Sequence, residues 1–189
     1  MDRTTLIGMT TGAAVMFGFG TIWVLLGLFR GRSSAIWVRF TLLFAGIALA
    51  LCISTLGKRA SSIPQTDVPV SQQQTAANRQ IGRHFYIVTG IEFATIFVSV
   101  IVLRLLAFPD YILCAIALIV GVHFFPLAAL FRAPIYYGTG LLGCAIGLVG
   151  FFTADSGLRQ KIVGISFGLL LWATAACLVV AALVSVPVS

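Results

Sequence analysis

Two side chains that could exchange a proton, Glu92 and His123, lie deep inside long apolar stretches of this 189-residue sequence. A carboxyl group in hydrocarbon must be protonated, paired or hydrated, because an isolated ion there is costly. Imidazole is the side chain whose ordinary charge change falls nearest neutral pH. These two residue types inside a membrane are typical of a polar pair that fixes helix packing, of a proton relay or ion-coupling site, or of a site that binds a lipid or small ligand.

The spacing of the two residues permits them to meet. Glu92 lies fifteen residues before Ala107, and His123 lies twelve residues after Tyr111, on either side of a reversal predicted at Pro109-Asp110. At about 1.5 Å per residue the two depths below the turn are ~22 Å and ~18 Å. The register therefore allows contact between adjacent antiparallel helices, but the spacing does not fix the rotation of either helix.

Glu92 is predicted to share one helix face with Thr89, Thr95 and Ser99. At about 100° per residue, the three hydroxyl side chains fall within about 60° of Glu92. A polar stripe on a spanning helix faces protein or water, because lipid offers its groups no partner. We therefore predict a polar intramembrane site made of Glu92, His123 and these three residues.

The elements that must position this site are membrane-spanning helices. Sixty per cent of the residues are hydrophobic and 9% are charged, against roughly 45–50% and about 25% in soluble domains. This composition excludes both a water-soluble globule and a disordered chain. Since a span needs about 20 apolar residues, the sequence predicts an all-α integral membrane protein, a six-transmembrane-helix bundle. The predicted spans are Leu6–Phe29, Ile36–Leu56, Phe85–Ala107, Tyr111–Leu130, Ile135–Phe152 and Ile162–Val184.

These spans are expected to form a single membrane domain over residues 1–189. Its one long connection, Gly57–His84, is rich in Ser, Pro and Gln, which is the composition of a polar flexible linker. Six spans place both termini on one side, but Lys and Arg divide six to six between the two sides, so the positive-inside rule does not fix the orientation. The sequence has a net charge of +7. Its basic residues are expected to contact the anionic headgroups of membrane lipids, and no nucleic acid partner is expected.

Glycines spaced four residues apart recur in three of the predicted helices. Such a spacing lets two helix backbones approach closely. It favours helix packing within one bundle, and the alternative interpretation is a homo-oligomer interface or a substrate-lining surface. The three pairs are Gly8 and Gly12, Gly143 and Gly147, and Gly164 and Gly168.

The sequence assigns no catalytic residue, and the expectation leans against an enzyme. It has no P-loop, no H-E-x-x-H and no C-x-x-C spacing. Zinc needs three or four ligands, and the second histidine of the chain, His84, lies at the predicted membrane edge. No metal and no cofactor are therefore expected.

One stretch of the sequence is distinctive: Gly121-Val122-His123-Phe124-Phe125-Pro126-Leu127-Ala128, followed by Leu130-Phe131 and Tyr136-Tyr137. Together with Glu92 in the preceding helix, it resembles small bacterial multi-pass membrane proteins to which no activity is assigned. The likeness covers roughly residues 81–140, less than a third of the chain.

This resemblance implies a protein of the bacterial cytoplasmic membrane, and it carries no ligand or catalytic residue. It marks Glu92, His123 and Pro126 as the characteristic part of the molecule. Pro126 follows His123 by three residues, removes a backbone donor and is predicted to kink its helix.

Three classes of function stay open. The preferred interpretation is a small transport or permeation-related component, for which a wet cavity should reach Glu92. A structural or partner-binding membrane protein should instead be a dry, closed bundle, and a lipid-acting enzyme should show a lateral cleft with polar groups at headgroup depth. The expected partners are membrane lipids and a second copy of the chain, and the sequence identifies no small-molecule or ion ligand.

Overall fold

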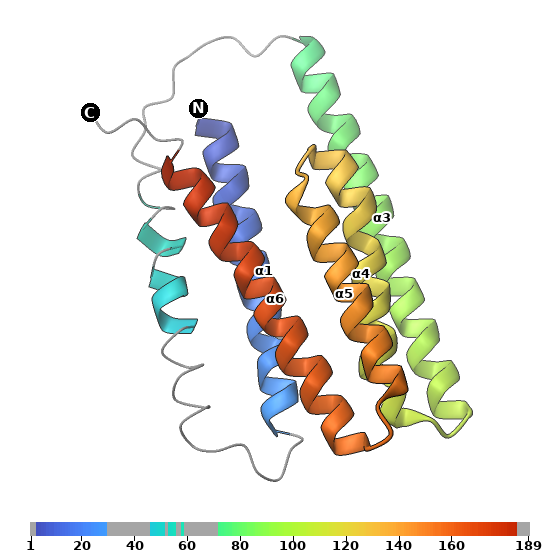
Figure 1. Cartoon of the computed structure of the whole chain (residues 1–189). Coiled ribbons are helices and arrows are strands. Elements are labelled where there is room, and N and C mark those ends of the chain that lie inside the picture. Colours follow the sequence, from blue (N-terminus) through green and yellow to red (C-terminus); the bar gives the residue numbers. More distant parts are fainter. Residues whose placement is uncertain (1–2, 30–45, 52, 56–57, 59–71, 185–189) are drawn as a thin grey trace. The chain divides into compact units, whose positions relative to one another are not determined.

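The computed structural model describes residues 3–29, 46–51, 53–55, 58 and 72–184, and these residues form helices and turns but no strand. Five long helices follow one another along the chain (Figure 1). Each of the five is long and apolar enough to cross a membrane. The prediction of an all-α membrane protein is confirmed to this extent. The elements are α1 (Arg3–Phe29), α3 (Gln72–Leu105), the 3-10 turn η1 (Pro109–Tyr111), α4 (Ile112–Phe131), α5 (Ile135–Phe152) and α6 (Ser156–Val184).

The second predicted span, Ile36–Leu56, falls largely outside the described residues. Its described parts, residues 46–51 and 53–55, are helical. The count of six spans therefore stays a prediction.

The described helices group into two compact units, whereas the sequence predicts one membrane domain over residues 1–189. One unit holds α1, the helical residues between 46 and 55, and α6 from Gly164 onward. The other holds α3, η1, α4, α5 and the first turns of α6 as far as Val163. Glu92 and His123 both belong to this second unit, so its internal packing decides their geometry.

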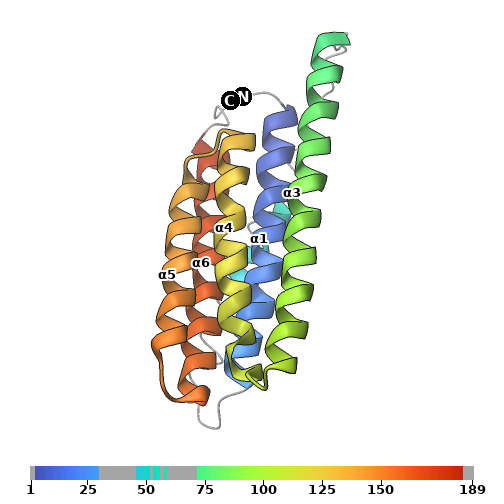
Figure 2. The same cartoon turned by 90° about the vertical axis from the view of Figure 1, so that its right-hand side faces the viewer.

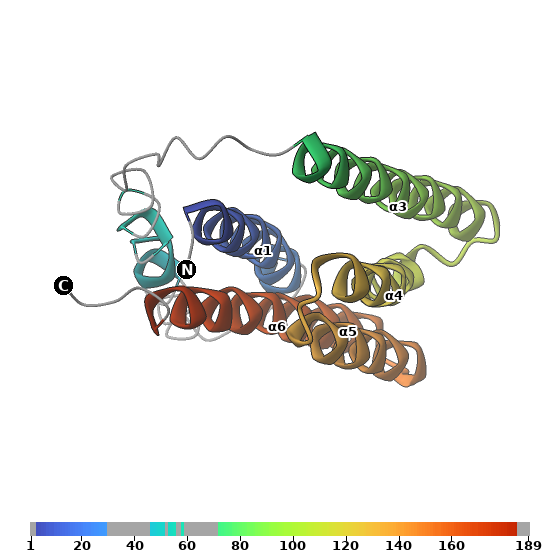
Figure 3. The same cartoon turned by 90° about the horizontal axis from the view of Figure 1, so that it is seen from above.

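Within the second unit, α4 lies between α3 and α5 (Figures 2 and 3). The α4–α5 contact is close. A Cβ atom added to Gly121 would lie 2.7 Å from the backbone nitrogen of Cys144, and one added to Gly140 would lie 2.8 Å from the Gly121 oxygen. Larger side chains at these glycines would push the two helices apart. By contrast, no residue of the span 79–105 of α3 is fully buried, so α3 is the more exposed of the three helices.

Within the first unit, α1 packs on α6 through facing glycines. A Cβ atom on Gly164 would lie 2.6 Å from the Cα of Gly27, and one on Gly168 would lie 2.6 Å from the backbone oxygen of Gly20. The indole nitrogen of Trp172 donates across the same contact to the Phe17 carbonyl oxygen at 3.3 Å. This contact combines close backbone approach with a partly buried hydrogen bond, and both features are common between membrane helices.

Individual residues explain where α4 ends and where α5 and α6 begin. Arg132 adopts a left-handed conformation with φ of 51°, which ends α4, and Pro134 then stands at the start of α5. At α6 the Oδ1 atom of Asp155 accepts a hydrogen bond from the backbone nitrogen of Leu158 at 2.6 Å, the arrangement of a helix N-cap. The short turn between α4 and α5 brings these two helices back alongside each other.

Helix α3 begins twelve residues before the end of the predicted linker. Residues 72–84 are helical, whereas the sequence predicts a flexible connection over residues 57–84. The reason is that Gln, Ala and Arg are good helix formers, and no proline and no glycine precede Gly82 in this stretch. The polar composition therefore reflects a helix that extends past its apolar span.

Arg159 ties the α3–α4 turn to the α5–α6 turn. Its side chain is buried, and its guanidinium group donates to the backbone oxygens of Gly150 and Thr153, which end α5. It also donates to the Tyr111 hydroxyl at 3.2 Å and lies 3.9 Å from the centre of the Tyr111 ring. The partial negative charge of a helix C-terminus suits a buried cation. The sequence places Arg159 in a connection and misses this role.

Candidate functional site

The structure brings Glu92 of α3 and His123 of α4 together. Oε2 of Glu92 lies 3.4 Å from Nε2 of His123, and the two side chains are 13% and 9% exposed. A carboxyl and an imidazole at this distance can hold one proton between them, on either group. The contact joins two helices at the depth that the register argument predicts.

Two exposed arginines on α3 give the depth of the pair. Arg83 and Arg104 are 21 residues apart, which is about 31 Å along a helix and matches the ~30 Å hydrocarbon core of a bilayer. Glu92 lies nine residues from Arg83 and twelve from Arg104, or about 13 Å and about 18 Å. The carboxyl group is therefore near the middle of the apolar span.

A hollow of about 380 Å³ lies beside the pair, between α3 and α4. Three of its lining side chains are polar, namely Glu92, Thr95 and His123, and the others are apolar. The hollow thus presents an acid–base pair to a space with apolar walls. It is lined by Val88, Ile91, Glu92, Thr95, Leu118, Ile119, Val122, His123 and Pro126.

Two buried polar atoms near the pair lack a hydrogen-bond partner among the described residues. They are Nδ1 of His123 and Oγ1 of Thr89. Because Nε2 of His123 faces Glu92, Nδ1 has no hydrogen-bond partner among the described residues in either tautomer. Buried polar groups in proteins nearly always have a partner, so these two atoms are places at which water or a polar ligand group can bind.

The other residues of the predicted polar stripe on α3 differ in whether they line the hollow. The Thr95 hydroxyl donates to the Ile91 carbonyl oxygen at 2.8 Å, and the residue lines the hollow. Ser99 is half-buried one turn further along α3 and is not among the residues that line the hollow. Of the three hydroxyl residues, Thr95 therefore lines the hollow, Thr89 places an unpartnered buried hydroxyl near the pair, and Ser99 does neither.

Helix α4 continues through Pro126 and ends five residues later, at Phe131. Proline has no backbone N–H, so the Val122 carbonyl loses the donor that an ordinary residue 126 would supply. Val122 and Pro126 both line the hollow. The proline thus weakens the backbone hydrogen bonding of α4 beside His123, where a carbonyl oxygen could serve a ligand.

The predicted packing glycines occupy different places. Gly143 and Gly147 are buried in α5, and a Cβ atom on Gly147 would lie 2.8 Å from Cγ of Leu118 on α4. Gly164 and Gly168 face α1, as described above, and Gly12 is half-buried. The burial of Gly8 lies outside what the structure describes.

The partners of Gly164 and Gly168 on α1 are Gly20 and Gly27, which the sequence reading misses. Their spacing of seven residues puts them on one helix face just as a spacing of four does. A search for both spacings would have found them.

Two glycine patterns in the sequence match enzyme motifs in spacing alone. Gly164, Ser166 and Gly168 fit G-x-S-x-G, and residues 138–143 fit G-x-G-x-x-G. Both lie inside helices, α6 and α5 respectively, whereas the first motif needs a strand-to-helix turn and the second a strand before the helix. Gly140, Gly143, Gly164 and Gly168 are buried or meet a neighbouring helix, whereas Gly138 is exposed, and neither pattern is a catalytic loop.

Among the described residues, no group of three or more His, Cys, Asp or Glu side chains could hold a metal ion. Comparison of the chain with protein-family models, with curated proteins and with solved structures finds no match. The function must therefore be argued from the geometry of the site.

Proposed function

We propose that this chain is a small transport or permeation component of a bacterial cytoplasmic membrane, with six spans, and that its Glu92–His123 pair takes up and releases a proton. The observation that supports the proposal is an acid–base contact of 3.4 Å near the middle of the apolar span. The hollow beside it adds space for the species that delivers or receives the proton. Ionisable residues inside a membrane are costly and commonly mark ion pathways or proton relays.

The chemistry of the pair suits such a role. With one proton between them, Glu92 and His123 carry no net charge, whether the proton resides on the carboxyl group or makes the imidazole cationic. A second proton would make the pair cationic, and removal of the only proton would make it anionic. Since a net charge is costly in this environment, the pair favours proton gain or loss that is coupled to a compensating charge.

His123 offers a route for the proton beyond the pair. Its Nε2 atom faces Glu92, and its Nδ1 atom has no partner among the described residues. An imidazole can accept a proton on one nitrogen and release one from the other, which is how histidine relays protons. The proposal therefore assigns the relay to His123 and the charge balance to Glu92.

A structural role is the second candidate, and one observation favours it. Helix α3 has no fully buried residue in its span, and the Glu92–His123 contact is a polar contact that joins it to α4. An interhelical polar contact can set helix register without any transport. The lipid-acting enzyme has less support, because the acid–base pair and the hollow beside it lie near the middle of the span and not at headgroup depth.

Proton flux into liposomes distinguishes these candidates. The purified chain is reconstituted into vesicles that contain a pH-sensitive dye, and a potassium gradient with valinomycin drives proton entry into them. Glu92→Gln and His123→Asn remove one ionisable group each with little change of size, and Ser99→Ala is the matched control on the same face of α3. The proposal expects flux through the wild type and Ser99→Ala, and strongly reduced flux through the other two variants.

Protein-free vesicles give the background in this experiment. No flux above that background for the wild type, combined with energetic coupling of the two residues, would support the structural candidate and reject the transport proposal.

A further inference from the structure

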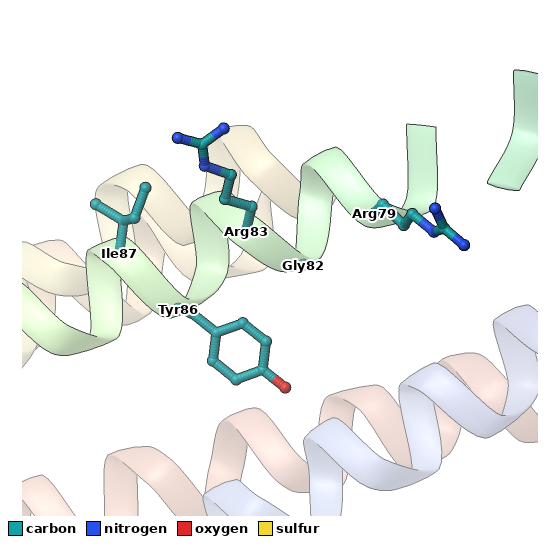
Figure 4. A pocket seen from close by; sticks show the side chains of 5 residues that line it. All are labelled: Arg79, Gly82, Arg83, Tyr86 and Ile87. Carbon is teal, nitrogen blue, oxygen red and sulfur yellow. The ribbon is translucent and has the colours of Figure 1, made fainter. Parts of the chain in front are cut away.

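We propose that the N-terminal part of α3 binds the phosphate headgroup of an anionic phospholipid through Arg79, Arg83 and Tyr86. These residues line a hollow on the helix together with Gly82 and Ile87 (Figure 4). Their spacing of three, four, seven and eight residues after Arg79 places all five on one face. This inference is independent of the transport proposal.

The two guanidinium groups are available to a ligand. Arg79 and Arg83 are exposed, and neither forms an ion pair with any acidic residue that the structure describes. The described carboxyl groups lie elsewhere: Glu92 is about 13 Å further along α3, and Asp110 and Asp155 lie in the turns beyond the other end of that helix. Unpaired arginines on one face suit an anion with several oxygens, because the guanidinium fork binds phosphate through two parallel hydrogen bonds.

The position along the helix matches the headgroup layer. Arg83 is one of the two arginines that bracket the ~30 Å apolar span, and Arg79 lies one turn further out. Tyr86 lies three residues inside Arg83 and is 76% exposed. Tyrosine favours this interfacial level, where the ring meets acyl chains and the hydroxyl group meets the headgroup or ester oxygens.

Gly82 leaves room for the ligand between the arginines. A Cβ atom built at this position would meet no other atom within 4 Å, so the hollow is open here. Ile87, which is 49% exposed, continues the same face into the apolar span and can contact an acyl chain. The face therefore combines cationic, interfacial and apolar groups in the order in which a phospholipid presents phosphate, ester and chain.

Charge complementarity favours an anionic over a zwitterionic lipid. Two basic residues near the surface are expected to favour an anionic headgroup roughly thirtyfold, because the choline group of a zwitterionic lipid offsets its phosphate. Phosphatidylglycerol with oleoyl chains is the test ligand, and phosphatidylcholine with the same chains is the comparison.

Native mass spectrometry of the full chain in detergent, titrated with each lipid, tests the site. Arg79→Gln together with Arg83→Gln should reduce phosphatidylglycerol binding at least tenfold. The matched control is Arg104→Gln together with Arg132→Gln, which removes the same charge from two other exposed positions and should change binding less than twofold. Arg79→Lys with Arg83→Lys, which keeps the charge but not the fork, should retain part of the binding.

Three results would overturn the proposal. One is an equal loss of binding in the glutamine pair and its control, which would make the effect one of net charge. Another is equal binding of the two lipids by the wild type. The third is displacement of bound phosphatidylglycerol by millimolar inorganic phosphate alone, which would make the site one for free phosphate and not for lipid.

Discussion

The Glu92 carboxyl group and the His123 imidazole meet at 3.4 Å, and this contact joins α3 to α4, which also meet through the rings of Phe85 and Phe131. Next to it, α4 and α5 pack closely through glycines. The pair therefore stands where α3 meets a tightly packed α4–α5 pair. It can hold α3 in place and, because it borders a hollow, exchange a proton with what enters there.

Glu92 and His123 should be energetically coupled. Glu92→Gln and His123→Asn, alone and together, are compared by the free energy of unfolding in mixed micelles. The double variant should lose about 0.6 kcal/mol less than the sum of the single variants, and at most ~1.7 kcal/mol less, which is the range for interhelical hydrogen bonds in membranes. Strictly additive losses would show that the two groups do not interact.

Gly140 should tolerate substitution far less well than Gly138, although the two lie on the same helix. A Cβ atom on Gly140 would lie 2.8 Å from the Gly121 oxygen, whereas one on Gly138 would meet nothing within 4 Å. Gly140→Val should therefore lower the free energy of unfolding by about 1–3 kcal/mol through overpacking. Gly138→Val is the matched control, and an equal loss there would mean that the α4–α5 contact does not depend on close backbone approach.

Arg159 should be needed for stability even though it is a charged residue near a helix end. Arg159→Met removes the donors that serve the oxygens of Gly150, Thr153 and the Tyr111 hydroxyl. The loss should be about 2 kcal/mol or more, because hydrogen bonds from a charged donor are among the stronger ones. Arg132→Met, at an exposed position, should change the unfolding free energy by less than about 0.5 kcal/mol. A similar effect of both substitutions would argue against the capping role.

The two termini should lie on the same side of the membrane. This follows from six spans, one more than the five spanning helices among the described residues. Reporter fusions at each end, one that is active only in the cytoplasm and one that is active only outside it, give the side of each terminus. Termini on opposite sides would require an odd number of spans and would contradict the six-span proposal.

The sequence predicts the helices well where composition alone defines them. The α5 bounds, Ile135–Phe152, match the predicted span, because Pro134 precedes the apolar run and residues 153–156, three of which are polar, follow it. The start of α3 is missed because a helix can extend beyond the membrane on polar residues, which composition alone cannot distinguish from a linker. The burial of Arg159 is missed because α6 also extends beyond its apolar span. The helix begins at Ser156, and Arg159 in its first turn donates a hydrogen bond to the Gly150 oxygen near the end of α5.

The sequence predicts the depth of Glu92 and His123 within the membrane, but not how α3 and α4 are rotated about their own axes. Residue counts from the turn place Glu92 and His123 at similar levels, since the helical rise is constant. Whether the two side chains face each other depends on how α3 and α4 are rotated, and that depends on packing between residues distant in the sequence. The hollow and the leftover Nδ1 atom of His123 depend on the same packing and leave no signal in the sequence.

The proton flux of Glu92→Gln relative to the wild type is the most direct test of the proposed role of the pair. Both proteins are reconstituted at equal density, and their folding is checked by resistance to unfolding before the flux is read. The account predicts a rate at least tenfold below that of the wild type for Glu92→Gln, with Ser99→Ala within twofold of the wild type. A folded Glu92→Gln variant that passes protons at the wild-type rate would contradict it.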